Sequence, residues 1–289
     1  MTDSTQSTTI AAAVDKRGRG RRPAARKRLE ASPWIVWGTR IFAFAVAMTM
    51  WQLFSTSRII NPFWFSSPKD VAKELADWTT SGVLTTNLAV TVEEAVLGFG
   101  LGVLGGIVFG LIFGSVPFIA RVFDPLILAL YSLPKIALAP LFVIWFGLYL
   151  EPKVVLAAVT VFFLVFFNTL TGVRYVNKEL VDVVRVVGAT RLQILRKVVI
   201  PSSLVWIFAG LRISIPYAMV GAITGELISS NRGIGYLIAN SAGYFDTAGV
   251  FAGLVIVMLV TSGLNALLGV IQRNFLSWTL ETTASNNAR

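Results

Sequence analysis

Residues 153–173 read KVVLAAVTVFFLVFFNTLTGV, and this stretch decides the fold class of the chain. One lysine stands at its start, and none of the residues that follow carries a charge. An apolar stretch of about 20 residues is long enough to cross the hydrocarbon core of a lipid bilayer as a helix. The stretch therefore predicts a membrane-spanning α-helix.

Five further stretches have the same character, and we bound them at 34–54, 87–113, 122–148, 203–228 and 248–271. The chain of 289 residues is 55% hydrophobic and only 14% charged, against about 25% charged in a typical soluble domain. Such a chain lacks the polar surface of a soluble globule. We predict an all-α polytopic membrane protein with six transmembrane helices and little mass outside the bilayer.

Several kinds of chemistry are excluded by residues that the chain lacks. It contains no cysteine and no histidine, which excludes disulfide frameworks, thiolate or imidazole metal sites and histidine general bases. No lysine follows a glycine, so the Gly-x4-Gly-Lys-Ser/Thr loop that cradles nucleotide phosphates is absent. We expect no catalytic residue, no metal and no cofactor, and we expect any ATP to be bound by another subunit.

The basic residues are divided unequally between the two sides of the predicted bundle. One side carries Lys16, Arg17, Arg19, Arg21, Arg22, Arg26, Lys27, Arg28, Arg121, Arg174, Lys178, Arg185, Arg191, Arg196, Lys197, Arg273 and Arg289. The other side carries only Arg58, Lys69, Lys73, Lys153 and Arg232. Cytoplasmic loops next to membrane spans carry the lysine and arginine excess. We therefore expect a protein of the plasma or inner membrane whose N- and C-termini both lie in the cytoplasm.

This orientation defines the predicted domains. Residues 1–33 form a disordered basic cytoplasmic tail, 34–272 the transmembrane domain with a cytoplasmic loop at 174–202, and 273–289 a cytoplasmic C-terminal tail. A basic tail can also touch anionic lipid or nucleic acid. We interpret it as the positive-inside signal and expect the lipid bilayer, and no nucleic acid, as a partner.

Five glycines recur every four residues through the second apolar stretch and just beyond it. Successive steps of four advance about 40° around a helix of 3.6 residues per turn, so the glycines form an oblique groove. A groove of small residues lets a neighbouring membrane helix approach closely. We therefore predict tight helix packing along Gly98, Gly102, Gly106, Gly110 and Gly114.

Prolines and charges inside the spans are candidates for a pathway or gate. Pro134 and Pro140 fall in the third stretch, where each removes a backbone donor that lipid cannot replace. Lys135 lies about 20 Å into the same stretch at 1.5 Å per residue, and deep ammonium groups usually face a bundle interior or cavity. Arg212 and Glu226 lie toward opposite ends of the fifth stretch. Kinked core helices and purely structural charge pairing are the alternatives.

The segment between the fourth and fifth stretches, ELVDVVRVVGATRLQILRKVVIPSS at 179–203, is too polar to cross a membrane and too apolar for a simple linker. A first helix is predicted from Glu179 to Val187 and ends at Gly188. A second is predicted from Thr190 to Ile200, with Pro201 marking its end. One face of the second helix carries Leu192, Leu195 and Val199. This pair of helices predicts a docking device for another protein or a hairpin on the membrane surface.

The same segment resembles the EAA loop of binding-protein-dependent ABC importer permeases. The pattern of that loop is E-A-A, three residues, Gly, nine residues, then I-x-L-P, and the spacing from Gly to Pro is kept here. The triplet itself differs, because Asp-Val-Val stands in place of E-A-A. The aspartate side chain is one methylene shorter than glutamate, and the two valines are larger than the alanines. The matching positions are Asp182, Val183, Val184, Gly188, Val198, Ile200 and Pro201.

The resemblance covers about residues 60–275. LPKIALAPLFVIWFG at 133–147, FFNTLTGVR at 166–174 and GELISSNRGIGYLI at 225–238 are similar to permeases of the nitrate/sulfonate/taurine type. The resemblance implies a type I importer with two permease subunits, here a homodimer, two cytoplasmic ATPases and an extracytoplasmic solute-binding protein. In such importers the loop inserts as a coupling helix into a groove of the ATPase. The permease itself performs no covalent chemistry and passes a small solute.

An ion-coupled secondary transporter or a channel is the alternative function, because intramembrane charge and broken helices also occur there. Ion coupling would favour a cluster of deep acids, but Glu93 and Glu94 are predicted in the first turns of their span, near the outer interface. Without a deep carboxylate pair, a membrane-embedded enzyme is disfavoured. The outer loops balance their charges, so they indicate no substrate of either sign.

Overall fold

The computed structural model describes residues 33–57 and 61–275, and the described residues contain helices and no strand. Five helices are long and apolar enough to cross a membrane. These are α2 (Pro33–Thr56), α5 (Val83–Ser115), α8 (Glu151–Arg174), α11 (Ile200–Ser229) and α13 (Thr247–Phe275). The predicted all-α polytopic fold class is confirmed. The predictions for the tails at 1–32 and 276–289 lie outside the described residues.

The third predicted span, 122–148, is bent. Helix α6 (Pro117–Ser132) is followed by the 3₁₀ turn η1 (Lys135–Leu138) and α7 (Ala139–Phe146), at an angle of 82°. The stretch 122–148 is therefore broken into two helices, and the described residues contain six spans if this bent pair counts as one. Leu133 adopts extended backbone (φ −65°, ψ 135°), as expected for a residue whose helical conformation is disfavoured by the proline that follows it.

The N-terminal part of α2, up to Met50, forms a unit of its own, and the rest of the chain forms a second unit. Within the first unit, the Arg40 guanidinium lies 5.4 Å from the centre of the Trp37 ring. A cationic group over an indole face is attracted by the ring. Arg40 therefore has a local partner on its own helix.

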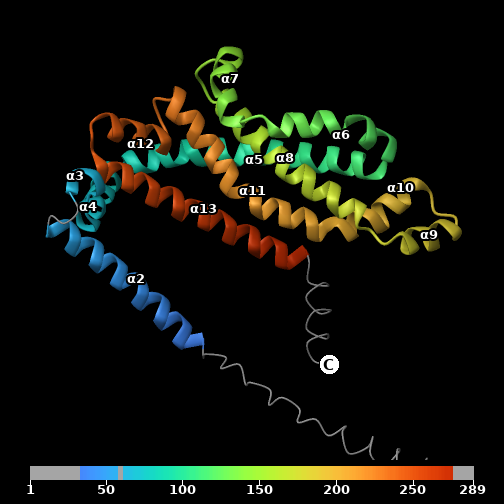
Figure 1. The fold of residues 1–289 in the computed structure, drawn as a ribbon, viewed down its shortest axis with the longest axis horizontal. Coiled ribbons are helices and arrows are strands. Elements are labelled where there is room, and N and C mark those ends of the chain that lie inside the picture. The colour runs from blue at the N-terminus through green and yellow to red at the C-terminus, as the bar shows by residue number, and fades with distance from the viewer. Residues whose placement is uncertain (1–32, 58–60, 276–289) are drawn as a thin grey trace, which may run out of the picture. The chain divides into compact units, whose positions relative to one another are not determined.

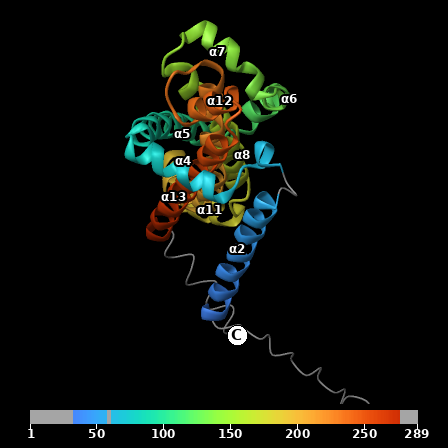
Figure 2. The ribbon, with the colours of Figure 1, turned by 90° about the vertical axis from the view of Figure 1, so that its left-hand side faces the viewer.

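Helix α8 is the centre of the second unit, where it packs against α5 and α11 (Figure 1). Its fully buried side chains include Leu156, Val161 and Phe166. Helix α13 packs against α11, α12 (Ile234–Gly243) and α4 (Pro68–Thr80). In both views α6 and α7 lie on the side of α8 away from α13 (Figure 2). The central helix is thus covered by protein on several sides.

The glycine stripe of α5 lies against α8. A Cβ atom built at Gly106 would stand 2.7 Å from Val165 Cβ and 2.9 Å from the carbonyl oxygen of Phe162. Real Cβ atoms do not approach other atoms so closely, so only glycine permits this separation of the two backbones. The same contact with α8 is made by Gly98, Gly102, Gly110 and Gly114.

Two groups of short helices lie at opposite ends of the bundle. Helices α9 (Lys178–Val186) and α10 (Arg191–Ile194) project from one end, and α3 (Pro62–Phe65), α4 and α12 lie at the other (Figure 1). Helix α10 continues through a π-helical turn, η2 (Leu195–Val199), directly into α11.

The predicted helix end at Pro201 is wrong, because Pro201 stands in the first turn of α11. The Ile200 N–H bonds to the carbonyl of Leu195, five residues back. A widened turn of this kind accommodates a residue that lacks an N–H and would crowd a regular α-helical turn.

Candidate functional site

The loop between α8 and α11 is built by local hydrogen bonds. Asn177 Oδ1 accepts from the Glu179 N–H at 2.8 Å and caps the start of α9. Gly188 follows the end of α9 at φ +89°, in the left-handed region that favours glycine. Thr190 and Gln193 form a reciprocal capping box that starts α10. These short-range hydrogen bonds produce two short helices joined by a turn.

Helix α9 exposes apolar side chains together with charged ones. Val183, Val186 and Val187 are 62%, 88% and 83% exposed. An ion pair between Asp182 Oδ1 and Arg185 Nη1, 2.8 Å long, lies beside them in solvent. Contiguous exposed apolar side chains with a charged rim are typical of a protein interaction surface. The exposed apolar residues of this docking face are Leu180, Val183, Val186, Val187 and Leu192.

The predicted loop residues divide by exposure. Asp182, Val183, Gly188 and Leu192 are exposed, whereas Val184, Leu195, Val198, Ile200 and Pro201 are half-buried. Ile194, which sequence reasoning left out, is buried. The second half of the loop therefore anchors it to the bundle, and the first half presents the docking face.

Lys135 stands at the break between α6 and α7. Its Nζ donates to the carbonyl oxygen of Tyr131 at 2.6 Å, which a continuous helix would have offered to the backbone N–H of Lys135 itself. The ammonium lies 4.3 Å from the centre of the Tyr131 ring and 5.2 Å from that of Phe163. Pro134 precedes this residue, and Pro140 lies in the first turn of α7.

A cavity of about 500 Å³ opens at Lys135 between α5, α6, α7 and α8. Lys135 is the only charged side chain among the described residues that line it. The other lining residues are Leu101, Gly102, Leu130, Leu133, Leu138, Leu141, Phe142, Trp145, Ala158, Val159, Phe162 and Phe163. We refer to it as the Lys135 cavity.

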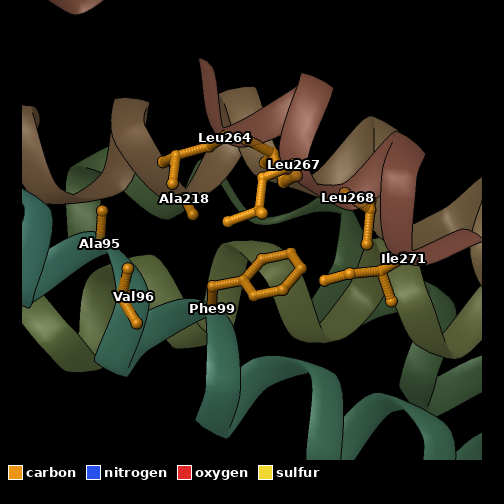
Figure 3. Close-up of a pocket in the computed structure, with 9 residues that line it drawn as sticks. Ala95, Val96, Phe99, Ala218, Leu264, Leu267, Leu268 and Ile271 are labelled. Carbon is orange, nitrogen blue, oxygen red and sulfur yellow. The ribbon is translucent and has the colours of Figure 1, made fainter. Parts of the chain in front are cut away.

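A second, smaller cavity of about 130 Å³ lies between α5, α11 and α13. The ring of Phe99 extends from α5 toward Leu267 and Ile271 of α13 (Figure 3). Every side chain that lines it is apolar, and a site for a polar solute needs convergent polar groups as well as apolar walls. This cavity is therefore a packing defect or an apolar site, and we do not assign the solute to it.

Glu226 belongs to a buried cluster of charges that joins several helices. Lys153 of α8 and Glu94 of α5 are 5% and 1% exposed, with Nζ 3.2 Å from Oε1. Glu226 of α11 is also 1% exposed, and its Oε1 accepts from the Thr91 hydroxyl at 2.6 Å. Both carboxylates are therefore covered by protein, near the end of the bundle where α8 begins and α11 ends. Helix α5 begins at Val83 rather than at 87, which places Glu94 about three turns along it.

The same cluster holds the start of α12. The backbone N–H groups of Gly233 and Ile234 donate to Asn87 Oδ1 at 2.7 Å and Thr91 Oγ1 at 2.8 Å. The Gly235 N–H donates to Glu226 Oε2 at 2.5 Å. A carboxylate at a helix N-terminus is stabilised by the unpaired donors and the helix dipole. The cluster therefore fastens α12 to α5 and α11.

Sequence reasoning missed three members of this charge cluster: Lys153, Thr91 and Asn87. Lys153 was assigned to an outer loop because it stands at the edge of its apolar stretch. Thr91 and Asn87 stand three and seven residues before Glu94, on the same face of a helix, and this spacing is the signal that could have found them. Arg212, in contrast, is exposed and makes no ion pair with a described residue. Neither Arg212 nor Glu226 lines the Lys135 cavity.

With this geometry established, comparison with known proteins assigns the family. Residues 102–278 match the family described as binding-protein-dependent transport system inner membrane component. The chain belongs to this family. The permease is 30% identical over 242 residues to the putative aliphatic sulfonates transport permease protein SsuC of Bacillus subtilis (strain 168), covering 84% of the permease and 88% of SsuC.

A second relative has a different named solute. The formylaminopyrimidine transport permease protein ThiX of Halalkalibacterium halodurans is 32% identical over 217 residues, covering 75% of the permease and 86% of ThiX. Among solved structures, a chain of the inward-facing MetNI methionine ABC transporter shares the fold, with a TM-score of 0.55 and 20% identity. The match covers 68% of the permease and 96% of that chain.

These findings confirm the resemblance to ABC importer permeases. Membership of the family implies a multi-pass inner-membrane protein that works with an ATPase and a solute-binding protein. The relatives transport chemically different solutes by their names. Family membership therefore leaves the solute of this permease to be inferred from its own residues.

Proposed function

We propose that this permease is the membrane-spanning subunit of an ATP-driven importer and passes a small solute delivered by a solute-binding protein. The observation that carries the proposal is the exposed docking face of α9, on a rigid loop that continues into α11. A separate cytoplasmic subunit hydrolyses ATP and docks on this face. Two copies of the permease form the pathway.

The physical basis of docking is burial of the valine side chains. Each Å² of apolar surface removed from water contributes about 25 cal/mol, and the basic residues around the loop add attraction to an acidic rim. Because η2 links α10 to α11 without a break, movement of a docked ATPase is transmitted to a helix that packs on α8, α5 and α13. The loop can therefore convert closure of an ATPase pair into a shift of the bundle.

For the solute, we propose a small molecule of the nitrate, sulfonate or taurine type or a related small organic compound. The named solutes of SsuC and ThiX are small molecules. The orientation follows from the positive-inside distribution, with both termini and the α9–α10 loop in the cytoplasm.

The test of ATPase docking is the Gly188→Arg variant. An arginine at φ +89° costs about 1–2 kcal/mol of backbone strain and adds bulk beside the docking face, whereas a Cβ there meets no neighbouring atom of the described chain. We expect normal membrane insertion, at least about tenfold less ATPase co-purified with the permease, equivalent to about 1.4 kcal/mol, and loss of uptake.

Gly82→Arg is the matched control. Gly82 also has positive φ (+74°) and open space around its Cβ, but it precedes α5 at the other end of the bundle. The control should keep the ATPase bound. Normal ATPase binding and uptake in Gly188→Arg would show that the loop is not the coupling element.

A further inference from the structure

Lys153 and Lys135 have different partners: Lys153 is buried, whereas Lys135 is half-buried. Lys153 has a carboxylate partner, Glu94, at 3.2 Å. Lys135 has no carboxylate within 4.0 Å among the described residues and relies on the Tyr131 carbonyl and two aromatic rings. An ammonium group has three N–H donors, of which the described contacts engage one with an oxygen. Lys135 therefore keeps donor capacity in an apolar setting.

The surroundings of this ammonium have the form of a ligand site. A volume of about 500 Å³ falls within the roughly 300–1,000 Å³ of sites for small molecules. Its walls include the aromatic side chains of Phe142, Trp145 and Phe163. One cationic group against apolar walls selects a ligand with an anionic end and an apolar body.

We infer that the Lys135 cavity binds a small organic anion, with a sulfonate- or carboxylate-type oxyanion on Lys135 Nζ and an apolar body against the aromatic wall. The inference rests on the proposed function, because the anion is the solute in passage. Pairing an oxyanion with the ammonium removes an uncompensated charge from an apolar environment, which is otherwise costly in a membrane. The groups that contact Lys135 Nζ, a backbone carbonyl oxygen and two aromatic rings, carry no net charge, so an anion meets no competing carboxylate there.

The natural absence of cysteine allows a direct measurement of the charge in this cavity. Leu138 lines the cavity three residues after Lys135 in a 3₁₀ turn, where side chains at i and i+3 eclipse one another. In Leu138→Cys protein in neutral-lipid nanodiscs, the rates of modification by sulfonatoethyl and trimethylammonioethyl methanethiosulfonates are compared. Their ratio cancels any effect of Lys135 on the thiol itself.

We expect the anionic-to-cationic rate ratio at Leu138→Cys to exceed that at the control Ser81→Cys by about tenfold, the low end of electrostatic focusing in a cleft. Adding Lys135→Met should lower the ratio to the control value, and adding Lys135→Arg should preserve it. An unchanged ratio in Lys135→Met would overturn the inference, and would leave Lys135 as a residue that only stabilises the break between α6 and α7.

Binding is tested with butane-1-sulfonate and its uncharged counterpart butane-1-sulfonamide. The sulfonate, and not the sulfonamide, should slow modification of Leu138→Cys by a neutral thiosulfonate, and Lys135→Met should abolish this protection. Equal protection by both compounds would overturn the charge-based recognition. Loss of protection in discs containing phosphatidylglycerol would show that a lipid headgroup occupies the site, which would overturn the assignment to the solute.

The outcome is separable from that of the proposed function. Lys135 lies outside the α9–α10 loop, so Lys135→Met should co-purify with as much ATPase as the parent chain. If the parent chain itself failed to retain an ATPase, the proposed function would fail whatever the labelling ratio. If ATPase binding were normal and Lys135→Met left the anionic-to-cationic rate ratio unchanged, only the proposal of an anion site would be wrong.

Discussion

At the residue scale, the energetic question is how this bundle tolerates Lys153. Removing an ammonium and a carboxylate from water costs several kcal/mol each, and their attraction offsets this cost only in good geometry. Lys153 Nζ has Glu94 at 3.2 Å and donates to Ser230 Oγ at 3.0 Å. The Glu94 carboxylate accepts no hydrogen bond from a described residue. Its charge is therefore compensated chiefly by Lys153.

This dependence predicts the effect of Lys153→Met. Removing one partner of a buried pair leaves the other charge uncompensated and costs about 3–5 kcal/mol. The double variant Lys153→Met/Glu94→Gln should recover most of the loss, because both charges of the ion pair are then gone and Glu226 keeps its hydrogen bonds from Thr91 and Gly235. Thermal unfolding in detergent, followed by tryptophan fluorescence, measures both changes, with exposed Lys69→Met as the control. A double variant no more stable than the single one would contradict the pairing.

At the element scale, α5 and α8 are held by close packing along the glycine stripe, and the Lys153–Glu94 ion pair joins them at one end. Lipid tails are as apolar as the helices, so association in a membrane depends on close packing and not on water exclusion. The stripe of glycines allows Val161, Val165 and Thr169 of α8 to enter the surface of α5. Even one added side chain would separate these backbones.

The prediction at this scale compares two glycines of α5. Gly106→Leu would drive a side chain into Val165 and the backbone of α8, whereas a Cβ at Gly100 meets no atom within 4 Å. Overpacking of this kind costs about 1–3 kcal/mol or more. Gly106→Leu should lower the unfolding temperature and the yield of monodisperse permease in size-exclusion chromatography, while Gly100→Leu should change neither. Equal behaviour of the two variants would mean that α5 and α8 do not meet in the membrane through this stripe.

At the scale of the whole molecule, the two ends of the bundle are built differently. The α9–α10 loop and its docking face lie at one end, and α4 and α12 lie at the other (Figure 1). The charge cluster fastens α12 at the second end through hydrogen bonds from Gly233, Ile234 and Gly235. An importer needs this polarity, because ATP is used on one side of the membrane and solute arrives on the other.

The topology is tested by labelling two cysteine variants with an impermeant thiol reagent added to intact cells. Ser202 and Ser81 are both exposed, and they lie at the α9–α10 end and the α4 end respectively. Ser81→Cys should react from outside, and Ser202→Cys should react only after the membrane is opened. Labelling of Ser202→Cys in intact cells would reverse the orientation.

Local sequence determined the elements of this protein. Apolar length predicts membrane helices, Gly188 predicts the end of α9, and Thr190 starts α10, because each signal acts through residues a few positions apart. The glycine spacing likewise predicts a close helix contact, since it depends only on the period of one helix. These features require no knowledge of the partner elements.

Tertiary structure alone decided which elements meet. The spacing of the glycines does not identify α8 as the helix that packs against them. The hydrogen bond from Thr91 to Glu226 joins residues 135 positions apart in the sequence. Lys153 appears at the edge of an apolar stretch in the sequence, yet in the fold it is buried because Glu94 and Ser230 come to it from other helices. A charge is tolerated in a bundle only through the groups that surround it, and those groups are set by long-range packing rather than by neighbours in the chain.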